Sequence, residues 1–62
     1  MDYRYVVLNS SGKATRADDW SCPSDVEAID RARHEAAPYG AELWRADRRL
    51  SVLPPRLAPA DG

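Results

Sequence analysis

Residues 24–40, SDVEAIDRARHEAAPYG, carry the strongest structural signal in this 62-residue chain. Ser24 and Glu27 have the spacing of a capping box, in which the serine hydroxyl accepts a hydrogen bond from the amide three residues further on. Acidic residues in the first turn also favour the positive end of a helix dipole. Pro38 and Gly40 then disfavour further helix. The stretch therefore predicts one helix that begins after Ser24 and is ended by Pro38 and Gly40.

The apolar residues of this helix recur at helical spacing, so they define the face that we expect to pack on the rest of the chain. They are Val26, Ile29, Ala32, Ala36 and Ala37. Most of them are alanines, which let a helix lie close to a sheet but bury little apolar area. The small size of this face limits the stability that the helix can provide.

Two hairpins are predicted on either side of the helix. Residues 3–8 are rich in aromatic and β-branched types, and after a turn residues 13–20 form a more polar strand that we place at or near a sheet edge. Residues 41–46 and 49–53 form the second pair of strands, joined by a turn at 47–48. The predicted fold is α+β with the order ββαββ, a four-stranded antiparallel sheet with one helix on one face.

We assign residues 1–53 to a single domain. The chain changes character at Pro54, and because proline cannot donate to a sheet ladder, residues 54–62 are expected to form a flexible, extended tail. A chain of this length buries only about 60% of the surface that its unfolded form exposes. Small domains of this kind depend on disulfides, metals, self-association or very regular packing.

Composition excludes several classes of protein. Nine basic and ten acidic residues give a net charge of −1, which argues against a general binder of nucleic acids or membrane surfaces. No apolar run approaches the roughly 20 residues of a membrane span, and the first residues do not resemble a signal peptide. Cys22 is the only cysteine, which suits a reducing compartment. We therefore expect a cytoplasmic protein without a disulfide.

Residues that could carry chemistry are few. Cys22 and His34 are the only soft metal ligands, whereas a closed zinc site needs four. His34 has no evident partner for acid–base work, and Cys22 has no second thiol nearby. Asp18 and Asp19 are adjacent, so a strand would point them to opposite faces, where they could not readily chelate one ion. We expect no enzymatic activity, no cofactor and no metal site.

The face of the sheet opposite the helix poses a problem, because it must be polar or be covered by something else. In the first strand Tyr3 and Tyr5 alternate with Val6 and Leu8, so both faces carry apolar bulk. Either arginine stems and the proline-rich tail fold over this face, or the face is a protein interface, most simply that of a homodimer. The candidate interaction surface comprises Tyr3, Tyr5, Trp44, Arg45, Arg48 and Arg49.

These features favour a small non-enzymatic protein-interaction module, an adaptor or regulator, that binds a protein partner or a second copy of itself. The alternative is a single-stranded nucleic-acid binder, in which Trp44 stacks on a base beside the guanidinium groups of neighbouring arginines. Salt dependence separates the two hypotheses, because phosphate contacts release counterions. An enzyme has no motif to support it.

Two stretches, CPSDVEAI at 22–29 and AELWRADRRL at 41–50, resemble a group of very short hypothetical proteins from alphaproteobacteria. The resemblance covers roughly residues 3–53, and its most specific part is the Glu-Leu-Trp-Arg hairpin sequence at 42–45. The group has no assigned activity, so the resemblance implies no functional residues. This chain departs from the pattern at Ala46, where a glycine is common, and in its longer proline-rich tail.

Overall fold

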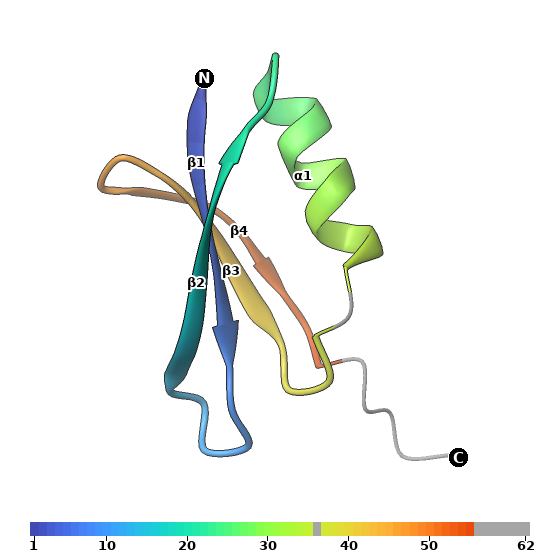
Figure 1. Ribbon diagram of the computed structural model, residues 1–62. Helices are drawn as coiled ribbons and strands as arrows, with labels where there is room; N and C mark the ends of the chain where they lie inside the picture. The colour runs from blue at the N-terminus through green and yellow to red at the C-terminus, as the bar shows by residue number, and fades with distance from the viewer. Residues whose placement is uncertain (36, 56–62) are drawn as a thin grey trace.

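Residues 1–35 and 37–55 are described in a computed structural model (Figure 1). The elements in chain order are β1 (Asp2–Leu8), β2 (Ala14–Ser21), α1 (Asp25–His34), β3 (Ala41–Arg45) and β4 (Arg48–Leu53). All neighbouring strands are antiparallel, and their order across the sheet is β2-β1-β3-β4. The predicted ββαββ fold is therefore confirmed, and β2 is an edge strand as expected.

Helix α1 lies along one side of the sheet and packs mainly against β4 and β3 (Figure 1). Beyond β4, Pro54 and Pro55 are exposed and belong to no strand. The rest of the predicted tail, residues 56–62, lies outside the described residues, as does Ala36 of the predicted helix face.

The start of α1 follows the prediction. Ser24 is the N-cap, with extended backbone, and its Oγ accepts a hydrogen bond of 3.3 Å from the Glu27 amide. The end does not follow it, because the helix stops at His34, well before Pro38. Gly40 does adopt a left-handed φ of 94°, but at the entry to β3. A side chain there would place its Cβ 2.9 Å from the Leu53 carbonyl oxygen, so this position requires glycine.

The turn between β3 and β4 is one residue earlier than predicted. Arg45 and Arg48 are cross-strand partners, so Ala46 and Asp47 form the connection. A two-residue hairpin turn requires left-handed backbone, and Ala46 accordingly has a φ of 55°. The ladder also shifts between Leu43 and Trp44, which leaves an extra residue in β4.

The core lies between α1 and the facing side of the sheet, and its centre is aromatic. Tyr5 and Trp20 stack with ring centroids 4.5 Å apart and planes inclined by 12°. The guanidinium of Arg31 lies 4.1 Å from the centre of the Trp20 ring and covers its other side. Leu43 is fully buried. The remaining buried apolar residues are smaller or lie nearer the rim: Tyr3, Cys22, Ala28, Ala32, Ala37, Ala41 and Leu53.

The buried face of α1 differs from the predicted one. Ala28 and Ala32 are buried, whereas Val26 is 76% exposed and Ile29 only partly buried. The helix is oriented by Asp25, which bonds to the sheet, and positions three and seven residues further on share its face. Val26 follows Asp25 directly and therefore points away from the sheet. Ala37 is buried as expected, but it lies beyond the helix end.

Replacing Ser24 with alanine is expected to destabilise the fold by about 0.5–2 kcal/mol, because the Glu27 amide loses its acceptor. Urea unfolding followed by circular dichroism measures the effect. Ser10→Ala, at an exposed turn position, is the matched control and should change stability by less than about 0.5 kcal/mol. Equal effects of the two variants would contradict the assignment of Ser24 as the cap.

Candidate interaction surface

The face of the sheet opposite α1, here called the outer face, is built from two rows of side chains that run across all four strands. The strand register defines both rows. The Trp44 row consists of Asp19, Arg4, Trp44 and Arg49, in the order β2, β1, β3, β4. The Val6 row, in the same order, consists of Ala17, Val6, Glu42 and Val52.

Trp44 lies between two arginines of the neighbouring strands, Arg4 on β1 and Arg49 on β4. Its indole Nε1 donates a 3.0 Å hydrogen bond to Glu42 Oε1. The other carboxylate oxygen of Glu42 is 3.5 Å from Arg49 Nη1, and at the other end of the row Arg4 Nε is 3.5 Å from Asp19 Oδ1. Both arginines are thus paired with acids, and the two rows together carry no net charge.

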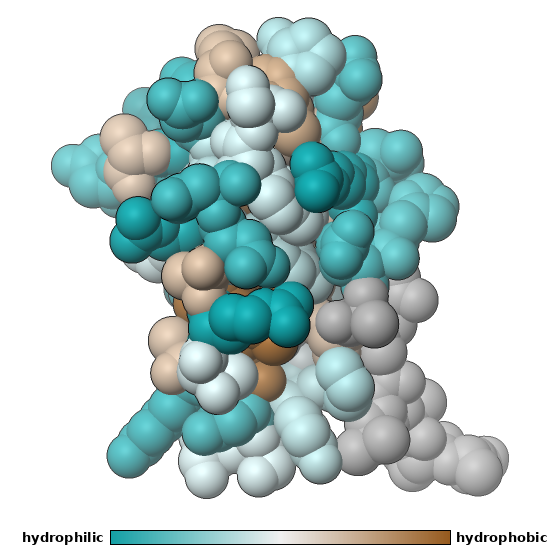
Figure 2. Space-filling view, in the orientation of Figure 1, coloured by the Kyte–Doolittle hydropathy of each residue, from teal (hydrophilic) through white to brown (hydrophobic). Residues whose placement is uncertain are grey.

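Apolar side chains fill the remaining positions of the outer face. Val52 is 57% exposed, while Val6 and Trp44 are partly buried by their neighbours. Figure 2 has the orientation of Figure 1, with α1 to one side of the sheet, and over this visible side of the molecule hydrophilic side chains predominate, with brown hydrophobic atoms in small areas between them. The outer face combines modest apolar area with fixed charge pairs.

The six residues predicted as the interaction surface do not lie together. Tyr3 and Tyr5 are buried on the side of the sheet that faces α1, so the prediction that they belong to the uncovered face is wrong. Tyr5 pairs with the buried Leu43, and strand alternation places Tyr3 on the same side. Trp44 and Arg49 do lie on the outer face, as predicted.

Arg45 and Arg48 also lie on the α1 side, apart from Trp44. Arg45 Nη1 bonds to Asp25 Oδ1 at 2.9 Å, and Arg48 is the cross-strand partner of Arg45. The prediction grouped residues adjacent in sequence, but consecutive residues of a strand point to opposite faces. Four of the six predicted residues are therefore removed from the outer face.

Tyr3 and Arg45 instead meet at Asp25, in a polar cluster that joins the first turn of α1 to the sheet. The Tyr3 hydroxyl donates a 2.6 Å hydrogen bond to the same Asp25 oxygen that accepts from Arg45. The bond from Tyr3, together with the charge of Arg45, lowers the pKa of Asp25. Burial and the neighbouring carboxylate raise the pKa of Tyr3, so its hydroxyl remains a donor at neutral pH.

Protonation of Asp25 is expected to remove part of the stability of the fold. Its folded-state pKa lies below the ordinary 3.8, so the stabilisation is complete above that value and is lost as the pH falls through the lower, folded-state pKa. The difference in unfolding free energy between the parent and Asp25→Asn should therefore decrease as the pH falls below 3.8. Urea unfolding at a series of pH values measures it.

A control for this prediction repeats the comparison in a Tyr3→Phe background, which removes the largest cause of the pKa shift. The decrease at low pH in the difference in unfolding free energy should then be smaller. A difference between parent and Asp25→Asn that stays constant down to pH 2 would show that Asp25 does not stabilise the fold through its charge.

The residues singled out for possible chemistry, His34 and Cys22, lie apart in the structure. His34 is exposed on α1, with Nδ1 2.8 Å from the Asp30 carbonyl oxygen, and Cys22 is a buried free thiol. Among these residues, no three histidine, cysteine, aspartate or glutamate side chains form a group that could hold a metal ion.

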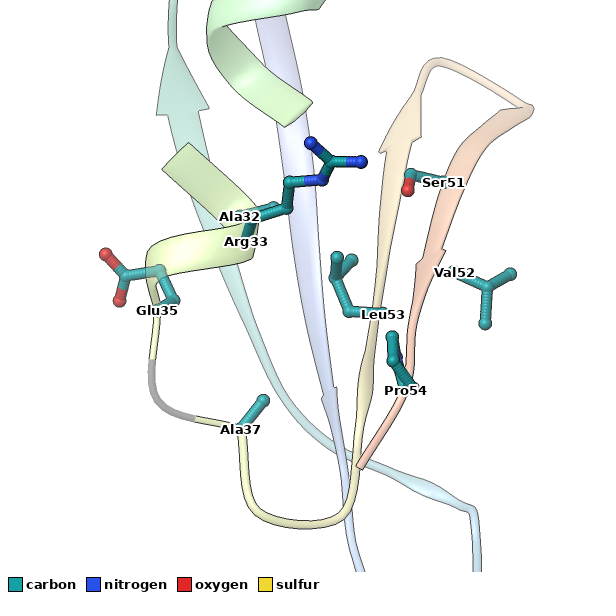
Figure 3. A pocket seen from close by; sticks show the side chains of 8 residues that line it. All are labelled: Ala32, Arg33, Glu35, Ala37, Ser51, Val52, Leu53 and Pro54. Carbon is teal, nitrogen blue, oxygen red and sulfur yellow. The ribbon is translucent and has the colours of Figure 1, made fainter. Parts of the chain in front are cut away.

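A cavity of about 340 Å³ opens between the end of α1 and β4 (Figure 3). Leu53 points toward the helix, while the carboxylate of Glu35 points away from β4 and Val52 away from α1. The charged groups around the cavity do not converge on one point, as a binding site for a small molecule requires. The cavity therefore lacks the converging polar groups that would make it a candidate ligand site.

Two outer-face residues, Arg4 and Val52, were missed by sequence reasoning. Only the strand register brings them close, because Arg4 pairs with Trp44 and Val52 pairs with Glu42. Glu42 is two residues from Trp44 on β3, so alternation alone places it on the same face. Alternation within β1 places Arg4 and Val6 on one face, but it does not say which face is covered. The buried pair of Tyr5 and Leu43 settles that point, and the pairing is visible only in the assembled sheet.

Comparisons with protein-family models, with curated protein sequences and with solved structures found no significant match to this chain. Within residues 1–35 and 37–55, no helix combines the length and apolar character that crossing a membrane requires.

Proposed function

We propose that this protein is a small, non-enzymatic protein-interaction module that binds its partner through the outer face of its sheet. The observation that carries the proposal is the position of Trp44 and Val52 on a sheet face that no helix covers within the described residues. A domain of this size has little buried area to spare, and apolar side chains on an open sheet face favour contact with another protein.

The charges of the outer face fit a protein partner better than a polyanion. Arg4 and Arg49 lie beside Asp19 and Glu42, respectively, and the phosphates of a nucleic acid would have to compete with those carboxylates. Alternating charges of both signs suit a protein surface, on which complementary pairs fix the register of binding.

Single-stranded nucleic-acid binding is the second candidate, and it is favoured by the placement of Trp44 between two arginines. A base could stack on the indole while the guanidinium groups contact phosphates. Titration with fluorescent oligonucleotides at several salt concentrations tests it. Binding that weakens steeply with salt and is lost in Trp44→Ala would support this candidate over the first.

The first candidate is tested by photo-crosslinking in cells that express the protein. A photoreactive amino acid replaces Val52, on the outer face, or Val26, which is more accessible still on α1 and serves as the matched control. We expect discrete protein adducts from position 52 that disappear when Trp44→Glu is added. Adducts of equal yield from both positions, or adducts to nucleic acid, would overturn the proposal.

We also propose that the protein acts in a reducing compartment, the cytoplasm. Cys22 is free and buried, and it packs within the core. Fractionation of cells and thiol labelling of the unfolded protein test this placement. Recovery of the protein from an oxidising compartment would contradict it.

A further inference from the structure

We infer that the partner of the outer face is a second copy of this chain, related to the first by a twofold axis that runs parallel to the strands. This inference rests on the proposed function and deepens it, because it names the partner and the geometry of the contact. The order of charges along the Trp44 row carries the argument: an acid at the β2 end and an arginine at the β4 end.

An axis parallel to the strands and between β1 and β3 exchanges the two ends of each row. It places β2 of one copy against β4 of the other, and β1 against β3. Asp19 then faces Arg49 of the second copy, and Arg4 faces Trp44 of the second copy. Each contact occurs twice, giving two ion pairs and two cation–π pairs.

The Val6 row also fits this arrangement. Its outermost members are apolar, so Ala17 on β2 faces Val52 of the second copy on β4. Val6 on β1 faces Glu42 of the second copy on β3, but Trp44 and Arg49 of its own chain already bind that carboxylate and hold it beside the Trp44 row. The exposed side chain of Val52 thereby gains an apolar neighbour.

The other in-plane axis, perpendicular to the strands, gives a poorer match. It places each strand against the same strand of the second copy. When the axis runs between the two rows, Arg4 faces Val6 of the second copy and Arg49 faces its Val52. No ion pair then forms between the two copies, whereas the axis parallel to the strands forms two. The charge pattern thus selects the axis parallel to the strands.

A hollow beside Arg4 and Asp19 of the Trp44 row suits the incoming arginine. It has a volume of about 540 Å³ and lies over the start of β1, where it is lined by Asp2, Tyr3, Arg4, Asp19 and Ala46. Two carboxylates and one guanidinium leave an excess of negative charge, which Arg49 of the second copy would balance. Packed sheets lie about 10 Å apart, a gap that arginine side chains bridge.

The contact is small, only two residues deep on each strand. Specific interfaces below about 1,200 Å² in total are typically weak, so the dimer should be reversible and dependent on concentration. Sedimentation equilibrium from about 1 µM to about 1 mM should therefore show a monomer–dimer equilibrium.

Two charge-reversal variants test the geometry. In a dimer of Asp19→Arg, the new arginine faces Arg49 of the second copy at each end of the interface. In a dimer of Arg49→Glu, the new glutamate faces Asp19 of the second copy at each end. Each variant by itself should dimerise at least about tenfold more weakly than the parent. In an equimolar mixture the two variants pair with complementary charges at both ends, so a heterodimer close to parental strength should form.

The mixture distinguishes a contact between chains from an effect within one chain. Any change inside a variant chain is the same whether that variant is measured alone or in the mixture, so only contacts between the two chains can strengthen association. Arg33→Glu, on the exposed side of α1, makes the same charge change as Arg49→Glu and should leave dimerisation within about twofold of the parent. Circular dichroism confirms that every variant is folded.

A monomeric parent at the highest concentration would overturn the inference, and so would a mixture that associates no better than its components. If the parent is monomeric but position 52 still crosslinks to a different protein, the proposed function stands and only the identity of the partner is wrong. If position 52 crosslinks to no protein either, both proposals fail.

Discussion

Replacing Trp20 with alanine is expected to destabilise the domain by about 3–5 kcal/mol, enough to unfold much of a protein of this size. Trp20 is the largest side chain of the core, and its ring lies between Tyr5 and the guanidinium of Arg31. Truncation removes both contacts and opens a cavity beside Tyr5. It also weakens the attachment of β2, an edge strand whose other side chains are mostly exposed.

Urea unfolding followed by circular dichroism measures the effect, at a protein concentration low enough to keep association from contributing. Trp44→Ala is the matched control, since Trp44 is only partly buried and lies outside the core. Should the alanine variant be unfolded in water, Trp20→Phe provides a graded measurement. Equal losses at positions 20 and 44 would refute the central role of the aromatic stack.

Leu43→Ala is expected to lower the free energy of unfolding by about 2–5 kcal/mol. Leu43 is fully buried on β3, a central strand, and its cross-strand partner Tyr5 is fully buried as well. The alanines of α1 that face the sheet are too short to fill the space that the leucine side chain would leave. Thermal and urea unfolding should both show the loss.

The matched control for this prediction is Val52→Ala, which shortens an exposed side chain on the neighbouring strand β4 and should change stability by less than about 0.5 kcal/mol. A parental melting temperature for Leu43→Ala would mean that the buried face of β3 is assigned incorrectly. If Val52→Ala leaves stability unchanged but weakens self-association, the result also supports the outer face as an interface.

The outer face and the core depend on each other through β1 and β3. Tyr5 and Leu43 fix which side of these strands is buried, and they thereby leave Trp44 and Val6 on the opposite side. The polar cluster at Asp25 draws Arg45 to the same buried side. Trp44 is consequently paired with Arg4 and Arg49, two residues far from it in sequence.

The sequence by itself determined the local features of this protein. The Ser24 cap, the position of the strands and the ββαββ order all depend on residues that are near one another in the chain, which is why capping and propensity could predict them. The polar composition of β2 likewise placed it at an edge of the sheet.

The tertiary structure alone decided which residues share a face. Tyr3 and Tyr5 alternate with Val6 and Leu8, and because both sets are apolar, the pattern of β1 fits either orientation. Cross-strand pairing with Leu43 chose between them.

The rotation of α1 and the turn at Ala46 were also set by contacts distant in sequence. Asp25 bonds to two strands and exposes Val26, although helical spacing placed that valine inside. Pairing of Arg45 with Arg48 forces Ala46 into a left-handed conformation that its own preference disfavours. Such contacts form only when the sheet assembles, so the energy of the whole fold overrides the local preference.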